Sequence, residues 1–353
     1  MASSIGPIFG LAGELVIENA KRLFDIIASK FGTSSNTLLL SGSLSSGYAP
    51  SQPGLIESQD EVFLSLKTGS SESKGTLTGI GFFIGGFGLI VFLFIGLFDE
   101  ILGADWWFLL FSLLAIAIPM IWEISRPPSL PIVFNRRTQE VYYEMKGDLY
   151  HANWDGIEAV AYEYKIINQY SGSIVHGNLE IILQKFGAPD ERIVLNLSGV
   201  PAGKRLPALI GIWEYLRCFM TVGPWFDEAG RKTESRNTFI EKGLKSGRVS
   251  FLDQLLQGRK FIGEERKEEN GISGSAFLYW LDSYLLFPFA FGMGCVQKID
   301  KMRSRKHWPD LVQERLDPNG PTTRLIDIEE VYMAQRQQEL DELHERMRKT
   351  LPR

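Results

Sequence analysis

The hydrophobic pattern of the chain is dominated by two long apolar runs, Ile80–Phe98 and Trp106–Ile124. A short segment separates them, and its charged residues are the acids Asp99, Glu100 and Asp105. As an α-helix, each run matches a bilayer core of roughly 30 Å in length. The alternative is a buried helical hairpin in a soluble core, but such helices are interrupted by polar positions more often. The pattern therefore predicts a transmembrane helical hairpin over residues 75–125.

Basic residues flank this hairpin and are absent from its connecting loop. Lys67 and Lys74 precede the first run, and Arg126, Arg136 and Arg137 follow the second. Because basic residues beside a span stay in the cytoplasm, we expect a multi-pass membrane protein with both termini cytoplasmic. The formal net charge of −5 argues against a nucleic-acid partner.

The first apolar run carries glycines at helical spacing. Gly81, Gly85 and Gly88 share one helix face. Small residues let helix backbones approach closely in a membrane. We expect this face to pack against the second run, and association with another copy of the chain stays open as an alternative.

After residue 130 the pattern changes from helical to alternating. Short strands are predicted in series, at Pro131–Asn135, Glu140–Tyr143, Leu149–His151, Ile157–Lys165, Ile174–Gln184 and Arg192–Leu197. Helical periodicity follows over Leu206–Met220 and stops before Gly223. Antiparallel strands closed by one C-terminal helix are the layout of a pleckstrin-homology-like (PH-like) domain. The predicted fold class is thus an α+β membrane protein with a cytoplasmic PH-like domain over residues 131–226.

The remaining segments flank these two parts. We expect an amphipathic helix within residues 1–32, which lies on the membrane or on the folded domain. Residues 33–54 are rich in serine and glycine and include Pro50 and Pro53, which predicts a flexible linker over residues 33–74. Residues 227–274 form a charged connector, and residues 307–353 form a C-terminal helical tail with a solvated helix over Leu325–Lys349.

Residues 275–306 contain a third apolar stretch, Ala276–Val296, interrupted by Asp282 and Pro288. Five basic residues follow it: Lys298, Lys301, Arg303, Arg305 and Lys306. A third span would export this basic cluster against the charge rule, so we expect re-entrant or interfacial helices whose basic end binds lipid headgroups. A true span and burial against the folded domain are the alternatives. In an interfacial segment Asp282 faces water, whereas at membrane depth it would be functional.

The sequence offers little chemistry. Residues Gly199–Arg205 resemble a phosphate-binding loop, but the spacing is short and Pro201 removes a backbone N–H group. Neither the four histidines nor Cys218 and Cys295 stand at metal-ligand or nucleophile spacing. We therefore expect no enzyme activity, no cofactor and no metal.

Several motifs together resemble an uncharacterised family of bacterial two-span inner-membrane proteins, defined as a domain of unknown function. They are the hairpin followed by Pro131–Thr138, Trp154 near Ile157, Trp213–Arg217 with Met220, Gly223 and Pro224, and finally His307–Asp310. The resemblance runs from the first apolar run to about Leu316. Because members look like neighbours of type VI secretion effectors, it implies an immunity or accessory role toward a secreted toxin.

The expected function is accordingly protein–protein binding by a non-enzymatic membrane protein, with the lipid bilayer and a cognate toxin or secretion-system protein as partners. The alternative is a membrane-tethered regulatory or scaffold module. Its PH-like domain would bind lipid headgroups or a protein.

Overall fold

The structure is a computed structural model that describes residues 36–98, 106–168, 172–199, 204–248, 253, 256, 284–303 and 308–350. These residues form two compact units. The sheet unit combines the described parts of residues 1–69, 130–247 and 307–353. The helical unit combines those of residues 70–129 and 248–306. Each unit is thus assembled from segments that are far apart in the sequence.

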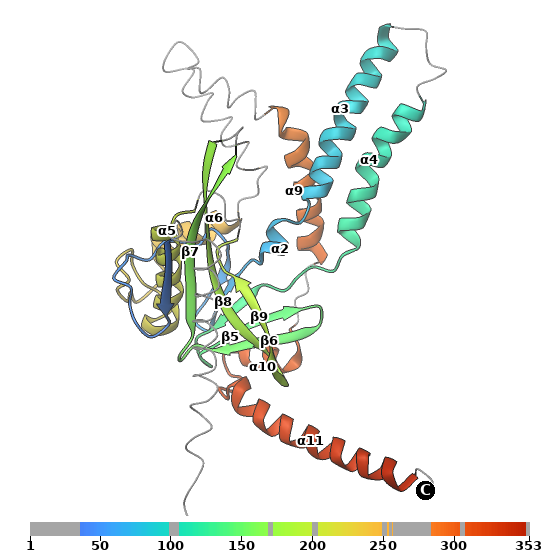
Figure 1. Ribbon diagram of the computed structural model, residues 1–353. Coiled ribbons are helices and arrows are strands. Elements are labelled where there is room, and N and C mark those ends of the chain that lie inside the picture. Colours follow the sequence, from blue (N-terminus) through green and yellow to red (C-terminus); the bar gives the residue numbers. More distant parts are fainter. Residues whose placement is uncertain are drawn as a thin grey trace, which may run out of the picture. The chain divides into compact units, whose positions relative to one another are not determined.

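The sheet unit is built on one antiparallel sheet of nine strands (Figure 1). The strands are β1 (Asn36–Ser41), β2 (Ile56–Gln59), β3 (Phe63–Leu66), β4 (Ile132–Asn135), β5 (Glu140–Met145), β6 (Asp148–Asn153), β7 (Glu158–Asn168), β8 (Gly172–Lys185) and β9 (Ala188–Asn196). Their order is β1-β7-β8-β6-β5-β4-β3-β2, and β9 pairs with β8. The six strands that alternation predicted between residues 131 and 197 are confirmed as β4 to β9.

Residues 33–74 are not a linker in the described part of the chain, and this expectation was wrong. They contribute β1, β2 and β3 to the sheet, followed by the short helix α2 (Gly69–Glu72). Leu40, Ile56 and Leu64 from these strands are buried in the main core. Composition misled the prediction because the strands are short and two of them pair with distant segments: β1 with β7, and β3 with β4. The sheet therefore extends well beyond residues 131–226.

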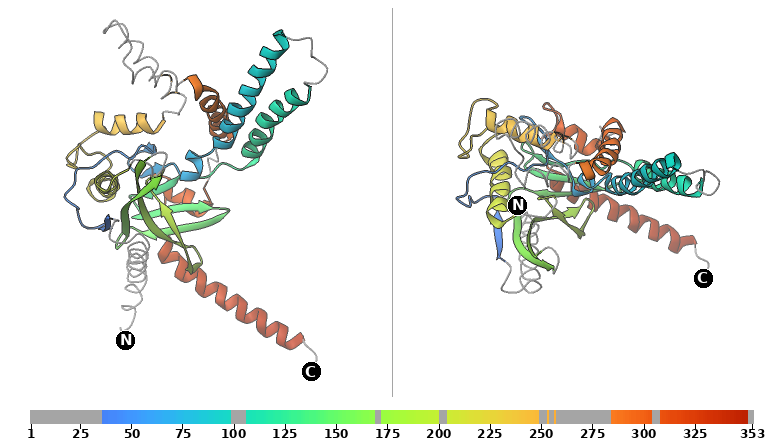
Figure 2. Two further views of the ribbon diagram at one scale, coloured as in Figure 1. Left: turned by 45° about the horizontal axis from the view of Figure 1, so that its top comes forward. Right: turned by 90° about the horizontal axis from the view of Figure 1, so that it is seen from above.

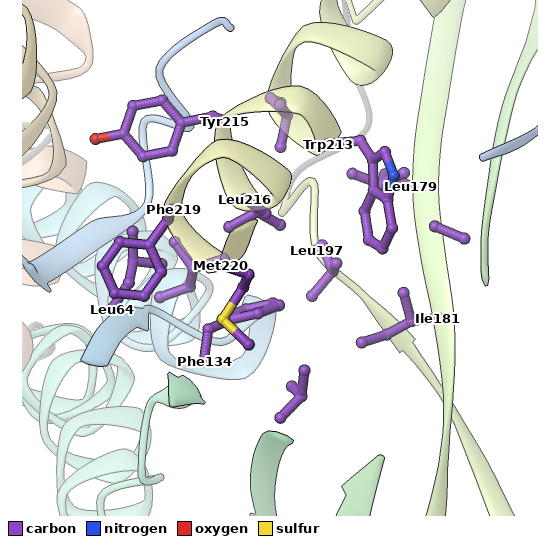
Figure 3. Close-up of a cluster of buried hydrophobic side chains, with 14 of the residues drawn as sticks. Leu64, Phe134, Leu179, Ile181, Leu197, Trp213, Tyr215, Leu216, Phe219 and Met220 are labelled. Carbon is purple, nitrogen blue, oxygen red and sulfur yellow. The ribbon is translucent and has the colours of Figure 1, made fainter. Parts of the chain in front are cut away.

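The predicted helix over residues 206–220 is confirmed, with a change of pitch near its end. It runs as α5 (Leu206–Arg217) and continues as a π-helical turn, η2 (Cys218–Val222), until Gly223, whose φ of 152° favours glycine. Figure 3 shows how its buried side chains pack on residues of the sheet. That core includes Leu64, Phe134, Leu179, Ile181, Leu197, Trp213, Tyr215, Leu216, Phe219 and Met220. The helix thus closes one face of the sheet.

The C-terminal tail belongs to the sheet unit. After α6 (Thr238–Arg248), the elements described in this unit are α10 (Asp310–Leu316) and α11 (Leu325–Thr350). A second core joins β4 and β5 to these helices through Leu130, Val133, Tyr142, Trp308, Val312, Leu316 and Leu325. The expectation of a solvated helix fails for the first two turns of α11, because Leu325 and Glu329 have partners in the sheet.

The helical unit contains α3 (Thr76–Phe98), α4 (Trp106–Ser125) and α9 (Phe287–Arg303). The first two pack together as a hairpin and are long and apolar enough to span a membrane. The strands on either side of this hairpin are neighbours in the sheet: Leu66 at the end of β3 pairs with Ile132 at the start of β4. The chain therefore leaves the sheet after β3, forms the hairpin, and returns to the sheet at β4, the neighbour of β3.

Candidate functional site

The outer surface of α3 and α4 is apolar and exposed. Phe87, Ile90 and Trp107 have exposed fractions of 65%, 62% and 79%. Only 28% of the apolar window in α3 and 11% of that in α4 is buried. A core helix of a soluble protein would be mostly buried, and a contiguous apolar surface of this kind requires apolar surroundings. This surface argues against the soluble-hairpin alternative.

The glycine face of α3 lies against α4. A Cβ atom built on Gly81 would collide with the backbone carbonyl of Ala115. One built on Gly85 would meet the backbone oxygen of Ser112, and one on Gly88 the hydroxyl of Ser112. The glycines thus allow the two helix backbones to approach closely, as the spacing of small residues suggests.

A buried carboxylate joins the same two helices. Glu123 of α4 is 5% exposed and accepts hydrogen bonds from the backbone N–H groups of Gly75 (3.1 Å), Leu77 (3.3 Å) and Thr78 (2.9 Å). It also accepts one from the Thr78 hydroxyl at 2.6 Å. These N–H groups have no partner within α3, so Glu123 caps that helix with a negative charge at its positive end.

Sequence reasoning missed this residue. The sequence pattern drew attention to Asp282 within the third apolar stretch, whereas Glu123 stands near the end of the second apolar run. A single carboxylate in an otherwise apolar helix is a usable signal, because it needs a buried partner. Asp282 itself lies outside the described residues, as does the predicted amphipathic helix within residues 1–32.

Cationic side chains gather at the same end of the helical unit. The Lys74 ammonium pairs with the Asp300 carboxylate of α9 and donates to the backbone carbonyl of Arg126 at 3.2 Å. Arg303 of α9 donates to the backbone carbonyl of Ile124. These bonds satisfy carbonyls at the C-terminal end of α4, which a helix leaves without internal partners.

The predicted basic cluster is only partly described. Lys298, Lys301 and Arg303 occupy exposed positions in the last two turns of α9. Arg305 and Lys306 lie outside the described residues. The described members share the end of the helical unit that holds Lys74, so positive charge is concentrated there.

A second polar cluster lies in the sheet unit, around His151 of β6. Its Nε2 atom is 3.2 Å from Oε2 of Glu329 on α11, and its Nδ1 atom is 3.7 Å from Oε1 of Glu140 on β5. The first distance allows a hydrogen bond, and the second is an ion-pair distance only. Burial by itself lowers the pKa of His151, but the two carboxylates reverse this and raise it above its ordinary value of 6.5.

Each carboxylate also forms hydrogen bonds that join α11 to the sheet, Glu140 from β5 and Glu329 from α11. Glu140 accepts hydrogen bonds from the backbone N–H of Leu325 (2.9 Å) and the Tyr142 hydroxyl (2.8 Å). Glu329 accepts them from Gln184 (2.9 Å) and from the N–H of Gly187 (2.6 Å). Since His151, Glu140 and Glu329 are all buried, this cluster fastens the start of α11 to the sheet. The sequence did not predict this cluster, because Glu329 is far from His151 and Glu140 along the chain.

Among the described residues, no group of three or more His, Cys, Asp or Glu side chains is arranged so that it could hold a metal ion. Gly199 follows β9 and Lys204 precedes α5, while residues 200–203 between them lie outside the described part. Cys218 is a buried thiol whose pKa is raised to about 11 by burial, and Cys295 is a half-buried thiol on α9. A thiol with so high a pKa is a poor nucleophile at neutral pH.

Comparison with protein-family models, with curated proteins and with solved structures finds no match for this chain. Function must therefore be argued from the geometry described above. Two features bear on function. One is the exposed apolar surface of the hairpin, and the other is the group of charged side chains near the start of α3 and the end of α4.

Proposed function

We propose that this chain is a non-enzymatic, multi-pass protein of the bacterial inner membrane that acts by binding another protein. The exposed apolar surface of α3 and α4 supports insertion in lipid, where helices satisfy their own backbone polar groups. We further propose that its partner is a toxin or component of a type VI secretion system, toward which it acts as an immunity or accessory protein. The sequence resemblance supports this choice of partner.

The exposed apolar surface carries the membrane proposal, and the pairing of β3 with β4 supports the orientation of the hairpin. The chain leaves the sheet after Leu66, forms the hairpin, and re-enters the sheet at Ile132. Both ends of the hairpin must then lie on one side of the membrane, as two crossings require. The cations at these ends, Lys74 and Arg126, support a cytoplasmic location for the sheet unit and both termini.

The edge of the sheet offers a binding surface. Among the described strands, β9 pairs only with β8, so its other edge has no strand partner. Val194 on this strand has an exposed fraction of 52%. An exposed edge can accept a strand from a partner protein through backbone hydrogen bonds. We propose β9 as the contact surface for a cytoplasmic partner.

Deletion of the gene tests the immunity role. In a strain that keeps the neighbouring toxin gene, deletion should cause killing between sister cells, and deletion of both genes should restore survival. A Val194→Lys variant should restore survival less well than the wild-type gene if β9 is the contact surface. Equal fitness of the single-deletion strain and its parent in co-culture would contradict immunity.

The second candidate is a membrane-tethered regulatory or scaffold module with a PH-like layout. The exposed cations Lys298, Lys301 and Arg303 favour it, because each can contribute about 1 kcal/mol near an anionic surface. Pull-down of partners from cells, together with reconstitution of the full chain in anionic or neutral nanodiscs, separates the candidates. Strong dependence on anionic lipid without a toxin partner would favour the scaffold.

A further inference from the structure

The charges of α9 are separated along its axis and not across it. Its first ten residues, Phe287–Val296, contain no charged side chain. Lys298, Asp300, Lys301 and Arg303 all follow in its last turns. A helix that lies flat on a membrane needs an apolar face opposite a charged face along its length. The pattern of α9 instead suits a helix inserted end-on, with its apolar half in lipid.

This helix runs antiparallel to α3 within the helical unit, and both views show the two side by side (Figures 1 and 2). Gly75 at the start of α3 lies at the backbone of Met293, and Gly79, one turn later, lies at Phe289. The Phe82 ring covers Gly292. Positions further along α3 toward its C-terminus therefore lie beside positions nearer the N-terminus of α9.

The beginning of α9 reaches about half the length of the span. Pro288 is the residue nearest to Gly86 of α3, with 3.9 Å from its Cβ to the Cβ position of that glycine. Gly86 lies ten residues after Thr76, where α3 begins, which is about 15 Å at 1.5 Å per residue. This is half of a bilayer core of roughly 30 Å.

The opposite end of α9 is tied to the charged end of the hairpin. Asp300 pairs with Lys74, and Arg303 donates to the carbonyl of Ile124. If Lys74 lies at the cytoplasmic boundary, the last turns of α9 lie there too. The apolar half of the helix must then point into the membrane.

The sheet unit limits how often the chain can cross. Leu130 and Val133, before this segment, share a core with Trp308 and Val312, after it. Both flanks of residues 248–306 thus belong to one folded body and lie on one side of the membrane. An odd number of crossings, and therefore a single third span, is excluded for that arrangement.

We infer that α9 is a third intramembrane helix, which enters the bilayer from the cytoplasmic side against α3 and begins near mid-depth. Lipid acyl chains contact the exposed side chain of Phe291 on α9 and those of Tyr284 and Leu285, which precede this helix. This inference rests on the proposed membrane location and decides between the interfacial and inserted alternatives for this part of the chain.

Single-cysteine labelling of the full-length protein in membrane vesicles tests this. Leu285→Cys, at the deep end, and Met302→Cys, which is 80% exposed in the wild type at the charged end, are each made in a Cys295→Ser background. Buried Cys218 is kept, and the Cys295→Ser protein gives the background signal. A membrane-impermeant maleimide is applied to inside-out and to right-side-out vesicles. We expect Met302→Cys to react at least tenfold faster in inside-out vesicles, and Leu285→Cys to react in neither before detergent is added.

Each outcome has one meaning. Equal labelling of both cysteines in inside-out vesicles would overturn the inference and leave α9 flat on the surface. Labelling of Leu285→Cys from the outside would also overturn it, because the helix would then emerge on the far side. Release of the protein from membranes by alkaline carbonate, tested separately, would overturn the proposed function itself.

Discussion

His151 of β6 and Glu329 of α11 meet in the interior of the sheet unit, with Nε2 and Oε2 separated by 3.2 Å. Glu140 lies on the other side of the imidazole, 3.7 Å from Nδ1. A charged imidazolium between two carboxylates binds the C-terminal helix to the sheet. An unprotonated imidazole would leave both acids without a cation at that point, so we expect the attachment of α11 to weaken as the pH rises.

The stability of the sheet unit should fall as the pH rises. The pKa of His151 in the folded state lies above its unfolded value of 6.5, because the neighbouring carboxylates outweigh burial. The stabilisation is therefore complete below about pH 6.5 and is lost as the pH rises through the folded pKa. Thermal unfolding from about pH 6 to about pH 9 measures this. His151→Gln should flatten the dependence, and an unchanged slope in that variant would contradict the assignment.

Removal of the Glu329 carboxylate should loosen the attachment of α11 to the sheet. Glu329→Ala leaves His151, Gln184 and the N–H of Gly187 without their acceptor, and breaking a buried pair costs about 3–5 kcal/mol. The neighbouring acid Glu330 is exposed, so Glu330→Ala is the matched control with an expected change within about 0.5 kcal/mol. Proteolysis of α11 and thermal unfolding report the difference, and equal effects of the two substitutions would refute it.

Adjacent glycines in α3 should respond differently to alanine. A Cβ atom at Gly85 would lie 2.5 Å from the backbone oxygen of Ser112, whereas one at Gly86 would have its nearest neighbour at 3.9 Å. Gly85→Ala should therefore destabilise the hairpin by about 1–3 kcal/mol through overpacking. Gly86→Ala should be neutral or stabilising by up to about 1 kcal/mol, since alanine favours the helix. Thermal unfolding in detergent compares them, and a smaller loss for Gly85→Ala than for Gly86→Ala would count against the packing described.

Loss of the Glu123 carboxylate should fray the start of α3. Glu123→Ala removes the acceptor for three backbone N–H groups and the Thr78 hydroxyl, and such a cap contributes about 0.5–2 kcal/mol. Hydrogen exchange at Leu77 and Thr78 should accelerate at least threefold. Glu123→Gln keeps an oxygen acceptor and should lose less. Unchanged exchange in the alanine variant would show that these groups find other partners.

Local patterns predicted the parts of this fold that depend on local sequence. The strands from Ile132 to Asn196 show alternating apolar and polar residues, and the apolar hairpin is marked by the length and apolar composition of its two helices. Both could therefore be predicted. The strand at Asn36–Ser41 is short and lies next to a Ser- and Gly-rich stretch, and it is stabilised by pairing with β7, more than a hundred residues later. The residues around β1 therefore do not indicate its pairing with β7.

The polar clusters divide in the same way. Glu123 could have been found, because an acid in an apolar helix demands a partner. His151, Glu140 and Glu329 could not, since each is an ordinary residue in its own surroundings and only the folded sheet brings them together. The position of α9 against α3 likewise depends on contacts such as that of Gly292 with Phe82, which charge counting does not reveal.

The pairing of Leu66 with Ile132 also sets an order of events during biosynthesis. The ribosome releases β3 before either apolar helix and β4 only after both. If the hairpin inserts in a membrane as proposed, sheet closure must wait until both apolar helices have been made and inserted, and until then β3 presents an unpaired edge prone to aggregation. A nascent chain whose hairpin fails to insert would be left with an unfinished sheet, which makes it a natural substrate for chaperones and proteases.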